Sequence, residues 1–424
     1  MSPVPGKFYD VIVAGGGVAG CAAALAAARN GASVLLIEKN CALGGLATVG
    51  LVNLFVPMCN GRGVPILRGL AEEFLRDSIK YGFNTLNHAW ADGWPKGATD
   101  LRYATKFSAG IFALQLLEKL VGEHVDILFD SVVSGVACGS PEQGASVTVL
   151  CEEGSVCFRA KILIDATGTA KLFSLAGAPV ETGNNYFSYH GYSVTLENCR
   201  TALEKGNIRY ACSWKHGGDA DLYGHRHPEN MPFYRGDTSV HVTEYLIANQ
   251  LSLLEKLKSE SASERDLCTL PGMPQLRTVS RIRGEYTMTE ADLYGHFDDS
   301  VTAVCDSERR DSLYEIPYRS LYCRDFPELI AAGRIISASG WLWDVTRVIP
   351  PAIVTGQAAG TAASMAARSG LSIPSVPVEM LQKSLAEQGV LLHFEDNWVP
   401  SGREAGEYSP ASHSHPDRIG GTAQ

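Results

Sequence analysis

The sequence predicts an α/β protein in which helices pack on a parallel sheet, with a smaller α+β domain inserted into the first. Its first forty residues have the pattern strand, helix, strand, and an alanine- and glycine-rich helix pattern returns towards the C-terminus. The stretch between them is richer in Tyr, His and Trp. We therefore expect residues 1–180 and 311–395 to form one discontinuous domain and residues 181–310 a second, followed by a disordered tail at 396–424.

The N-terminal elements are predicted from apolar runs and from the residues that interrupt them. Phe8 to Ala14 is a β-rich apolar run, Val18 to Arg29 is an alanine-rich helix pattern, and Val34 to Ile37 is a short buried strand. Two apolar strands joined by a helix form a βαβ unit, so these strands should be parallel.

Later elements follow from periodicity in the same way. Apolar residues at three- and four-residue spacing predict amphipathic helices over Ile66–Tyr81 and Thr105–Glu123. Short β-type runs separated by turn residues predict an antiparallel meander over Val125–Asp165. Towards the C-terminus we expect a strand at Ile335–Ile336 and a long helix from about Pro351 to Arg368.

Composition excludes several classes of protein. The 424 residues carry 36 Lys and Arg against 46 Asp and Glu, a net charge of −10, which argues against a nucleic-acid partner. No apolar segment approaches the roughly 18 residues of a membrane span, and the N-terminus does not resemble a signal peptide. The eleven cysteines form no Cys-x-x-Cys pair, so we expect no metal site and a cytoplasmic protein with reduced thiols.

A glycine motif stands where the first strand turns into the first helix. Gly15 would permit the tight turn, Gly17 would let a diphosphate approach the backbone, and Gly20 would let helix and strand pack closely. Glu38 ends the next strand, 18 positions after Gly20, where a carboxylate accepts ribose hydroxyls. Strand, helix and acid in this register favour a dinucleotide site over a glycine-rich turn without a ligand.

Further segments resemble one family of flavoproteins, and together with the glycine motif they extend from about residue 8 to 370. These segments are Glu38–Gly50, Ile164–Gly168, Gln275–Thr289, Gly333–Ser339, Arg347–Pro351 and Gly356–Ala363. They resemble the FAD-dependent oxidoreductase family of the glutathione-reductase-like FAD fold. That family is distantly similar to the flavoprotein subunits of fumarate and heterodisulfide reductases.

The resemblance implies a Rossmann-like FAD-binding domain, FAD as the cofactor, and a set of residues that bind it. That set is Gly15, Gly17, Val18, Ala19, Gly20, Glu38, Lys39, Gly44, Gly45, Leu46, Val133, Ala166, Thr167, Gly168, Ser339, Arg347, Pro351 and Ala352. Pro350 and Pro351 suit the first turn of a helix. We expect the amides just after them to face the N1–C2 edge of the flavin and to stabilise its reduced anion.

Candidates for catalysis lie mainly in the inserted domain. His190 and Tyr192 alternate on a predicted strand and could move a proton, although a lone histidine is more often structural. In the alternating run Arg281–Met288, Arg281 and Arg283 share a face with Glu285 and could hold a substrate carboxylate or form a structural ion pair.

Two aromatic or histidine-rich segments have less specific interpretations. Tyr286 in the same alternating run is more often a core aromatic than a proton donor. Trp341, Trp343 and Asp344 would either form a wall of the pocket or cover the core. His225 and His227 have no acidic or cysteine partner at ligand spacing, so no metal is expected there.

These observations lead to one hypothesis with alternatives. The chain would be an FAD-dependent oxidoreductase that transfers a hydride between a small organic substrate and flavin N5. A short-chain-type NAD-dependent dehydrogenase would need Tyr-x-x-x-Lys, which is absent. A non-catalytic FAD-binding scaffold stays open, and RNA modification is disfavoured by the charge. Disulfide chemistry is not expected, because Leu46–Leu54 lacks cysteine. The sequence leaves homodimerisation and the electron partner open.

Overall fold

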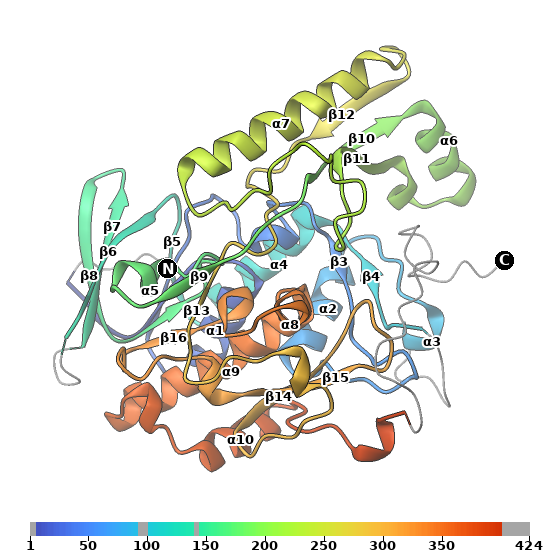
Figure 1. The fold of residues 1–424 in the computed structure, drawn as a ribbon. Coiled ribbons are helices and arrows are strands. Elements are labelled where there is room, and N and C mark those ends of the chain that lie inside the picture. Colours follow the sequence, from blue (N-terminus) through green and yellow to red (C-terminus); the bar gives the residue numbers. More distant parts are fainter. Residues whose placement is uncertain (1–5, 92–100, 140–143, 401–424) are drawn as a thin grey trace.

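The computed structural model describes residues 6–91, 101–139 and 144–400. Its centre is a seven-stranded sheet of order β5-β2-β1-β8-β7-β6, with β16 also beside β8 (Figure 1). The strands are β1 (Phe8–Ala14), β2 (Val34–Ile37), β5 (Asp126–Leu128), β6 (Val132–Cys138), β7 (Ala145–Cys151), β8 (Gly154–Asp165) and β16 (Leu329–Ala331). β1 is parallel to β2 and β8, so the predicted βαβ unit is confirmed.

Helices α1, α5 and α9 contact this sheet, and further helices pack around them. The helices of this part are α1 (Val18–Arg29), α2 (Leu70–Lys80), α3 (His88–Ala91), α4 (Ala109–Gly122), α5 (Lys171–Leu175), α8 (Trp341–Thr346), α9 (Ile349–Ser369) and α10 (Val378–Glu387). α1 and α9 pack closely because glycines stand where they touch. A Cβ atom added to Gly356 would lie 2.2 Å from the Ala19 oxygen, and one on Gly360 would lie 2.1 Å from the Ala23 oxygen.

Three elements differ from their predicted form for local reasons. α2 begins at Leu70 rather than Ile66, because Gly69 has φ +61° and a right-handed helix cannot continue through a residue in that conformation. α4 begins at Ala109 because Thr105–Lys106 forms a short strand, β4, against β3 (Leu54–Phe55). Within the predicted meander, β6, β7 and β8 are antiparallel as expected, but β5 is parallel to β2.

The predicted strand at Ile335–Ile336 was wrong. Gly333–Ile335 forms a 3₁₀ turn, and the strand that joins the sheet is β16, a few residues earlier. Both segments are buried, and a short apolar run has no periodicity that would separate a strand from a turn.

A second hydrophobic core lies beside the first. It belongs to the antiparallel strands β10 (Ser188–Thr195), β11 (Cys212–Asp219) and β12 (Arg265–Thr269), with α6 (Leu196–Lys205) and α7 (Ser239–Lys258). Tyr189, Tyr245 and Leu253 are at its centre. Figure 1 shows α7 above this small sheet, at the far side of the molecule from α10.

The residues of the two cores bear on the predicted division of the chain. The buried residues of the second core lie between Phe187 and Val279. Buried residues between Ile282 and Cys305, which include β14 (Ser300–Cys305), pack in the first core, as does the partner strand β15 (Leu313–Pro317). β9 (Val180–Thr182) and β13 (Ser280–Ile282) pair at the base of the second core. The 181–310 domain stays a prediction, and its last thirty residues share the core of the larger part.

The chain is ordered beyond the predicted start of the tail at 396. Asp396–Trp398 forms a 3₁₀ turn, and Trp398 and Val399 pack against the first core. Residues 401–424 lie outside the described part of the chain.

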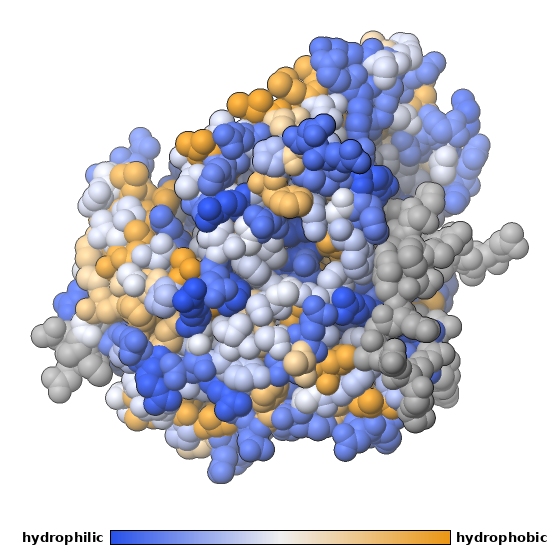
Figure 2. Space-filling model, in the orientation of Figure 1, coloured by the Kyte–Doolittle hydropathy of each residue, from blue (hydrophilic) through white to orange (hydrophobic). Residues whose placement is uncertain are grey.

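The surface is mainly hydrophilic on the face that Figure 2 shows, with apolar side chains gathered along α7. Val240, Ile247, Leu251 and Leu254 are exposed there. Within the described ranges, no helix combines the length and apolar character that crossing a bilayer requires.

Candidate functional site

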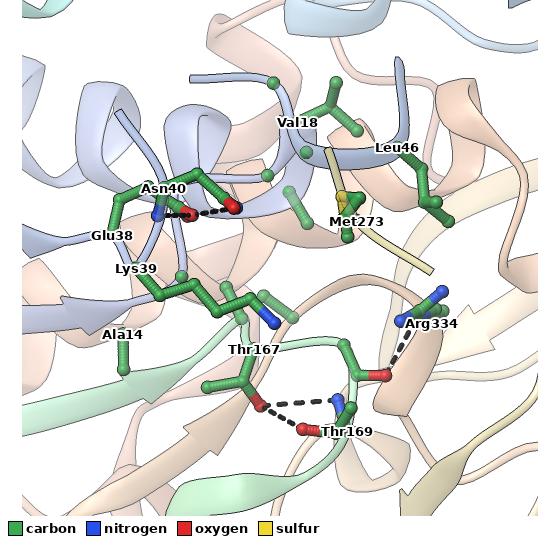
Figure 3. A pocket seen from close by; sticks show the side chains of 18 of the residues that line it. Ala14, Val18, Glu38, Lys39, Asn40, Leu46, Thr167, Thr169, Met273 and Arg334 are labelled. Carbon is green, nitrogen blue, oxygen red and sulfur yellow. Dashed lines mark hydrogen bonds between the residues drawn. The ribbon is translucent and has the colours of Figure 1, made fainter. Parts of the chain in front are cut away.

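A cavity lies at the carboxyl ends of the parallel strands β1, β2, β8 and β16 (Figure 3). Open α/β sheets bind their ligands at such strand ends. The cavity has a volume of about 310 Å³ and a mainly apolar lining. Its walls come from the loops that follow these four strands, the start of β6 and the first turn of α9.

The three glycines after β1 have three different roles. Gly15 has φ +100°, and a Cβ atom on it would lie 2.5 Å from the Ala166 oxygen. A Cβ atom on Gly20 would lie 1.8 Å from the Gly15 oxygen, so Gly20 is required for packing. A Cβ atom on Gly17 would meet nothing within 4 Å, and Gly17 lines the cavity. Only Gly17 therefore leaves its open face to a ligand.

The N-terminus of α1 also faces this cavity. Its first helical hydrogen bond runs from the Cys21 amide to the Gly17 oxygen, at 2.8 Å. The amides of Val18, Ala19 and Gly20 precede it and have no acceptor within the helix. Val18 and Ala19 line the cavity. This end of α1 is suited to an anionic group such as a diphosphate.

Glu38 ends β2 with a buried carboxylate that hydrogen bonds hold in place. Its Oε2 accepts from the Gly16 amide at 2.5 Å, and its Oε1 accepts from the amide and side chain of Asn40 at 2.8 and 2.6 Å. Glu38 is only 4% exposed and lines the cavity together with Lys39 and Asn40. A fixed carboxylate with remaining lone pairs can accept hydroxyl groups of a sugar.

The Gly44–Gly45 pair brings a second loop against the first. Both residues have positive φ, +98° and +54°, and a Cβ atom on Gly44 would lie 2.4 Å from Thr48. The Gly44 amide donates to the Gly16 oxygen at 2.7 Å. Leu46 and Ala47 then extend this wall of the cavity.

Asp165 organises the loop after β8. Its fully buried carboxylate accepts hydrogen bonds from the Thr167 amide and hydroxyl and from the Leu172 and Phe173 amides. Burial nevertheless raises the pKa of Asp165 above its usual value. Gly168 in this loop has φ +72°, and its oxygen accepts from Arg334 Nε at 2.7 Å. The Ile164–Gly168 segment is thereby tied to the segment after β16.

The structure brings the predicted cofactor residues together around this cavity, with three exceptions. Gly20 does not line the cavity, because it lies beneath the glycine loop. Ser339 does not line it either, and donates its amide and hydroxyl to the Met288 oxygen, at 2.8 and 3.3 Å. Pro351 is buried within α9, where its oxygen accepts from Thr355. Val133 and Ala352, far apart in the sequence, both line the cavity.

The expected amides at the start of α9 are largely missing. Of its first three residues, Ile349, Pro350 and Pro351, only Ile349 carries an N–H. The next amide, of Ala352, already donates to the Val348 oxygen at 3.0 Å. The expectation that amides after the prolines face a ligand was therefore wrong. The positive group that lines the cavity here is the side chain of Arg347.

Several lining residues were missed by the sequence analysis. They are Ala14, Ile37, Asn40, Ala47, Ser131, Val132, Thr169, Lys171, Met273, Ala332, Arg334 and Ile349. Arg334 had a detectable signal, since an arginine directly after a buried strand and a glycine is costly unless it has a task. Met273 had no such signal in the sequence, because its loop comes more than a hundred residues after the preceding segment that lines the cavity.

His190 and Tyr192 lie on β10 and contact the loop that follows Leu46, and the lining of the cavity includes neither of them. His190 Nε2 is 3.1 Å from the Leu51 oxygen, and because a carbonyl only accepts, Nε2 carries the proton. Tyr192 donates its hydroxyl to Asn53 Oδ1 at 2.5 Å. Burial lowers the pKa of His190 to about 4 and raises the pKa of Tyr192. Proton transfer by either residue stays a prediction.

The predicted alternating strand at Arg281–Met288 is limited to β13, at Ser280–Ile282. Arg281 is buried and Arg283 is exposed, and both pair with Glu181 of β9. A structural ion pair with Glu285 was one of the alternatives left open by the sequence, but Glu285 pairs with Arg324 at 2.9 Å. Both arginines of the predicted substrate clamp share the single carboxylate of Glu181 across the paired strands β9 and β13, and the cavity lining includes neither of them.

Tyr286 and the tryptophans near α8 pack as structural side chains. Tyr286 donates its hydroxyl to Asp292 at 2.5 Å, and burial with this carboxylate raises the pKa of Tyr286 to about 12. Trp341 stacks on Tyr223 with ring centroids 5.1 Å apart, and Trp343 donates Nε1 to the Arg334 oxygen at 2.7 Å. Trp343 therefore helps to hold in place the backbone of Arg334, a residue that lines the cavity.

A group of potential metal ligands lies outside this cavity, although the sequence analysis expected no metal site. His296, Glu315 and His393 have ligand atoms within 4.8 Å of one another. Glu315 accepts from His296 Nδ1 at 2.6 Å, from His393 Nδ1 at 3.0 Å and from the Phe297 amide at 2.8 Å. Asp396 and Glu315 raise the pKa of His296. These hydrogen bonds account for the group without an ion.

His225 and His227 have separate hydrogen-bond partners. His225 Nδ1 is 2.8 Å from Asp221 Oδ2, and His227 bonds the Phe187 amide and the Met231 oxygen. Both histidines therefore organise the loop after β11.

The fold and the cavity define a class of protein. A glycine loop, an exposed helix N-terminus and a fixed carboxylate meet at adjacent ends of parallel strands, as in proteins that bind dinucleotides. A model of the FAD dependent oxidoreductase family matches residues 10–252 and 243–385. The chain belongs to this family, and its cofactor is FAD.

Solved structures with a similar outline include three that align over most of the chain. A geranylgeranyl bacteriochlorophyll reductase-like protein from Thermoplasma acidophilum is 16% identical with a TM-score of 0.42, covering 91% of this chain and 84% of that one. A flavoprotein/dehydrogenase from Cytophaga hutchinsonii is 15% identical with a TM-score of 0.42, covering 89% of this chain and 83% of that one. The p-nitrophenol 4-monooxygenase from Pseudomonas putida is 12% identical with a TM-score of 0.46, covering 93% of this chain and 91% of that one. The family assignment rests on the family model.

Proposed function

We propose that this protein is an enzyme that holds FAD in the cavity and transfers a hydride between a small organic substrate and flavin N5. The flavin supplies the two-electron chemistry, and the protein supplies binding, orientation and charge. The observation that carries this proposal is the open face of Gly17 beside the first amides of α1, which have no acceptor within the helix, with the fixed carboxylate of Glu38 at the neighbouring strand end.

In this proposal the cofactor lies along the cavity. Glu38 accepts the adenosine ribose hydroxyls, and the diphosphate lies on the N-terminus of α1 against Gly17. Figure 3 shows Glu38 and Asn40 at one end of the cavity and Met273 and Arg334 at the other. The isoalloxazine ring would lie at this second end, among the apolar side chains of Leu46, Met273 and Ile349 and beside Arg334 and Arg347.

The substrate would approach from the side of the second core. Met273 belongs to the segment that leads from β12 to β13, and His190 is linked to the same segment through Gln275. Gln275 Nε2 also donates to the Gly50 oxygen at 2.7 Å, which connects this segment to the loop after Leu46. If His190 moves a proton, its neutral ring can accept one at Nδ1, because Nε2 donates to the Leu51 oxygen.

The test is the visible absorption spectrum of the purified protein, measured after gel filtration and again without oxygen after NADH is added. We expect two flavin bands that stay with the protein. Bleaching by NADH would identify a reductase, and bleaching only by an organic substrate would identify a dehydrogenase or oxidase. A protein that binds FAD but that neither NADH nor any substrate reduces would be a scaffold. A colourless protein that FAD cannot reconstitute would contradict the proposal.

Gly17→Ala is expected to weaken FAD binding about tenfold to a hundredfold while the fold is kept. The added methyl group meets no protein atom but occupies the space proposed for the diphosphate. The stability of the apoprotein should change by no more than about 1 kcal/mol, the range for an N-cap substitution. FAD titration of the apoprotein, followed by flavin fluorescence, measures the affinity.

Gly122→Ala is a matched control, because Gly122 is an exposed residue of α4 whose added Cβ atom also meets nothing. This variant should bind FAD as the wild type does. Wild-type affinity in Gly17→Ala would show that the diphosphate does not lie against Gly17.

A further inference from the structure

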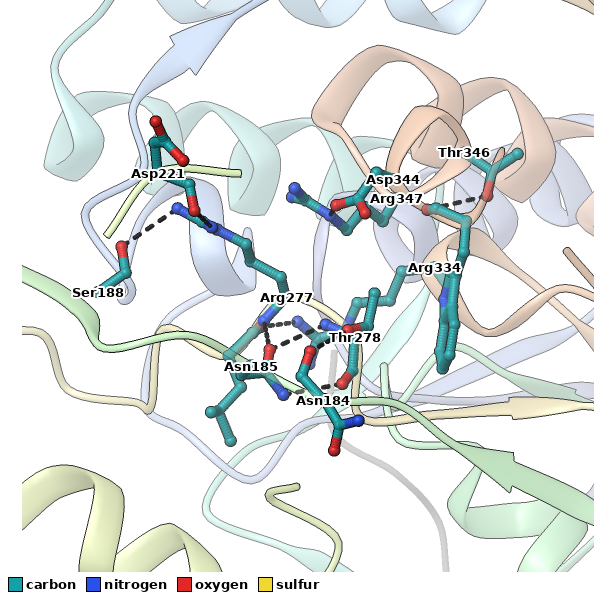
Figure 4. A network of polar contacts seen from close by, with 12 residues as sticks. Asn184, Asn185, Ser188, Asp221, Arg277, Thr278, Arg334, Asp344, Thr346 and Arg347 are labelled. Carbon is teal, nitrogen blue, oxygen red and sulfur yellow. Dashed lines mark hydrogen bonds and ion pairs between the residues drawn. The ribbon is translucent and has the colours of Figure 1, made fainter. Parts of the chain in front are cut away.

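Three arginines converge at the Met273 end of the cavity. Figure 4 shows Arg277, Arg334 and Arg347 close together, and the charge of Arg347 acts on both of the others. Arg334 and Arg347 line the cavity. Within the described residues, one carboxylate bonds to these three groups: Asp344 accepts from Arg347 Nε at 2.6 Å.

The other two arginines bond to neutral oxygens. Arg334 donates to the oxygens of Gly168 and Leu276, at 2.7 and 2.6 Å. Arg277 donates to the Asp221 oxygen at 2.9 Å and to Ser188 Oγ at 3.1 Å. These bonds fix both guanidinium groups but do not neutralise them.

The carboxylate of Asp221, which lies near Arg277, has other partners. It accepts from the Tyr223 and His225 amides and lies 2.8 Å from His225 Nδ1. Burial and the charge of Arg347 lower the pKa of Arg277 and of Arg334 to about 10, so both stay protonated near neutral pH. The cluster therefore carries more positive than negative charge.

Arg347 has an unused donor at the centre of this cluster. Its Nη2 is buried, and no acceptor in the described part of the chain lies within hydrogen-bond distance. A buried charged donor without a partner is costly, and an anionic acceptor in the cavity would satisfy it. The backbone at the start of α9 cannot bind an anion in place of Arg347, since Pro350 and Pro351 lack N–H groups.

We propose that Arg347 binds the carboxylate of an organic-acid substrate at this end of the cavity, with Arg277 and Arg334 adding to the positive potential. This inference rests on the proposed function, in which the FAD diphosphate lies at the N-terminus of α1 and the adenosine ribose at Glu38, at the opposite end from Met273. A guanidinium group matches the planar geometry of a carboxylate with paired hydrogen bonds. The enzyme would then distinguish organic acids from their neutral amides.

The test uses the holoprotein and three small carboxylates, acetate, benzoate and succinate, each with its amide as the neutral analogue. Binding beside the isoalloxazine ring is followed by the change in the visible flavin spectrum. We expect at least one carboxylate, and none of the amides, to perturb the wild-type spectrum. Arg347→Gln should raise the dissociation constant of that carboxylate about tenfold to a hundredfold, the loss of a charge-assisted hydrogen bond.

Two further variants separate charge, geometry and remote effects. Arg347→Lys keeps the charge without the paired donors and should bind the carboxylate with intermediate affinity. Arg324→Gln is the control, because Arg324 is exposed and pairs with Glu285 away from the cavity. It should behave as the wild type.

The outcomes separate this inference from the proposed function. A protein that cannot hold FAD contradicts the proposed function. A holoprotein whose spectrum responds to no carboxylate, or responds equally in Arg347→Gln, overturns this inference alone. Loss of FAD itself from Arg347→Gln, with Arg324→Gln unaffected, would assign Arg347 to the cofactor diphosphate and would also overturn it.

Discussion

Gly360→Ala is expected to destabilise the protein by about 3 kcal/mol or more. Gly360 lies where α9 crosses α1, and its added methyl carbon would lie 2.1 Å from the backbone oxygen of Ala23. A backbone atom cannot rotate away as a side chain can, so the two helices would have to separate. Both are buried almost along their whole length, which makes such overpacking costly.

Urea unfolding of the apoprotein measures this change, with Gly110→Ala as the matched control. Gly110 is an exposed residue of α4 whose Cβ atom would meet nothing, and alanine there should stabilise the protein by about 0.5–1 kcal/mol. The same substitution should therefore act in opposite directions at the two sites. A loss below about 1 kcal/mol at Gly360 would show that the α1–α9 contact adjusts easily.

The free energy of unfolding is expected to fall by about 2 kcal/mol between about pH 7 and about pH 5 because His190 is buried in the folded protein. Burial lowers the pKa of His190 to about 4, against 6.5 for an unperturbed histidine, so the unfolded chain binds more protons between these values. Stability therefore rises with pH through this window. The contribution is complete above the unfolded pKa and is lost as the pH falls towards the folded one.

The measurement is the free energy of unfolding of the wild type and of His190→Gln at several pH values across this window. Glutamine keeps a donor for the Leu51 oxygen but does not titrate. The difference between the two proteins should shrink by about 2 kcal/mol from pH 7 to pH 5. His88→Gln removes an exposed histidine and serves as control. Parallel pH profiles for His190→Gln and the wild type would show that His190 is protonated normally in the folded state.

The N-terminal part of the fold could be predicted because its signals are local. Val18–Arg29 and the strands on either side match the structure, since each is an apolar run with a glycine or polar boundary. Errors arose where a distant segment decides the structure. Thr105–Lys106 leaves the predicted helix because Leu54–Phe55 pairs with it, and this partner is fifty residues away.

The residues at the Glu38 end of the cavity were predicted better than those at the Met273 end, for a related reason. Glycine spacing and the acid after β2 report on one βαβ unit, which a single stretch of sequence contains. The arginines are different, because only tertiary contacts decide which of them meets a carboxylate. Arg281 and Arg283, the predicted substrate clamp, share Glu181 of β9. Arg334, which the sequence analysis missed, lines the cavity and donates to backbone oxygens, and Arg347 lines it beside Asp344.

The two prolines that open α9 have a consequence for how this scaffold can diversify. Because the backbone there offers almost no donors, recognition of an anion at this end of the cavity falls to side chains and not to the main chain. If Arg347 binds the substrate as proposed, a single codon change at position 347 would alter which molecules are admitted while helix and sheet stay as they are. Relatives that share the framework need not share a substrate, and the residue at this position is the first to compare among them.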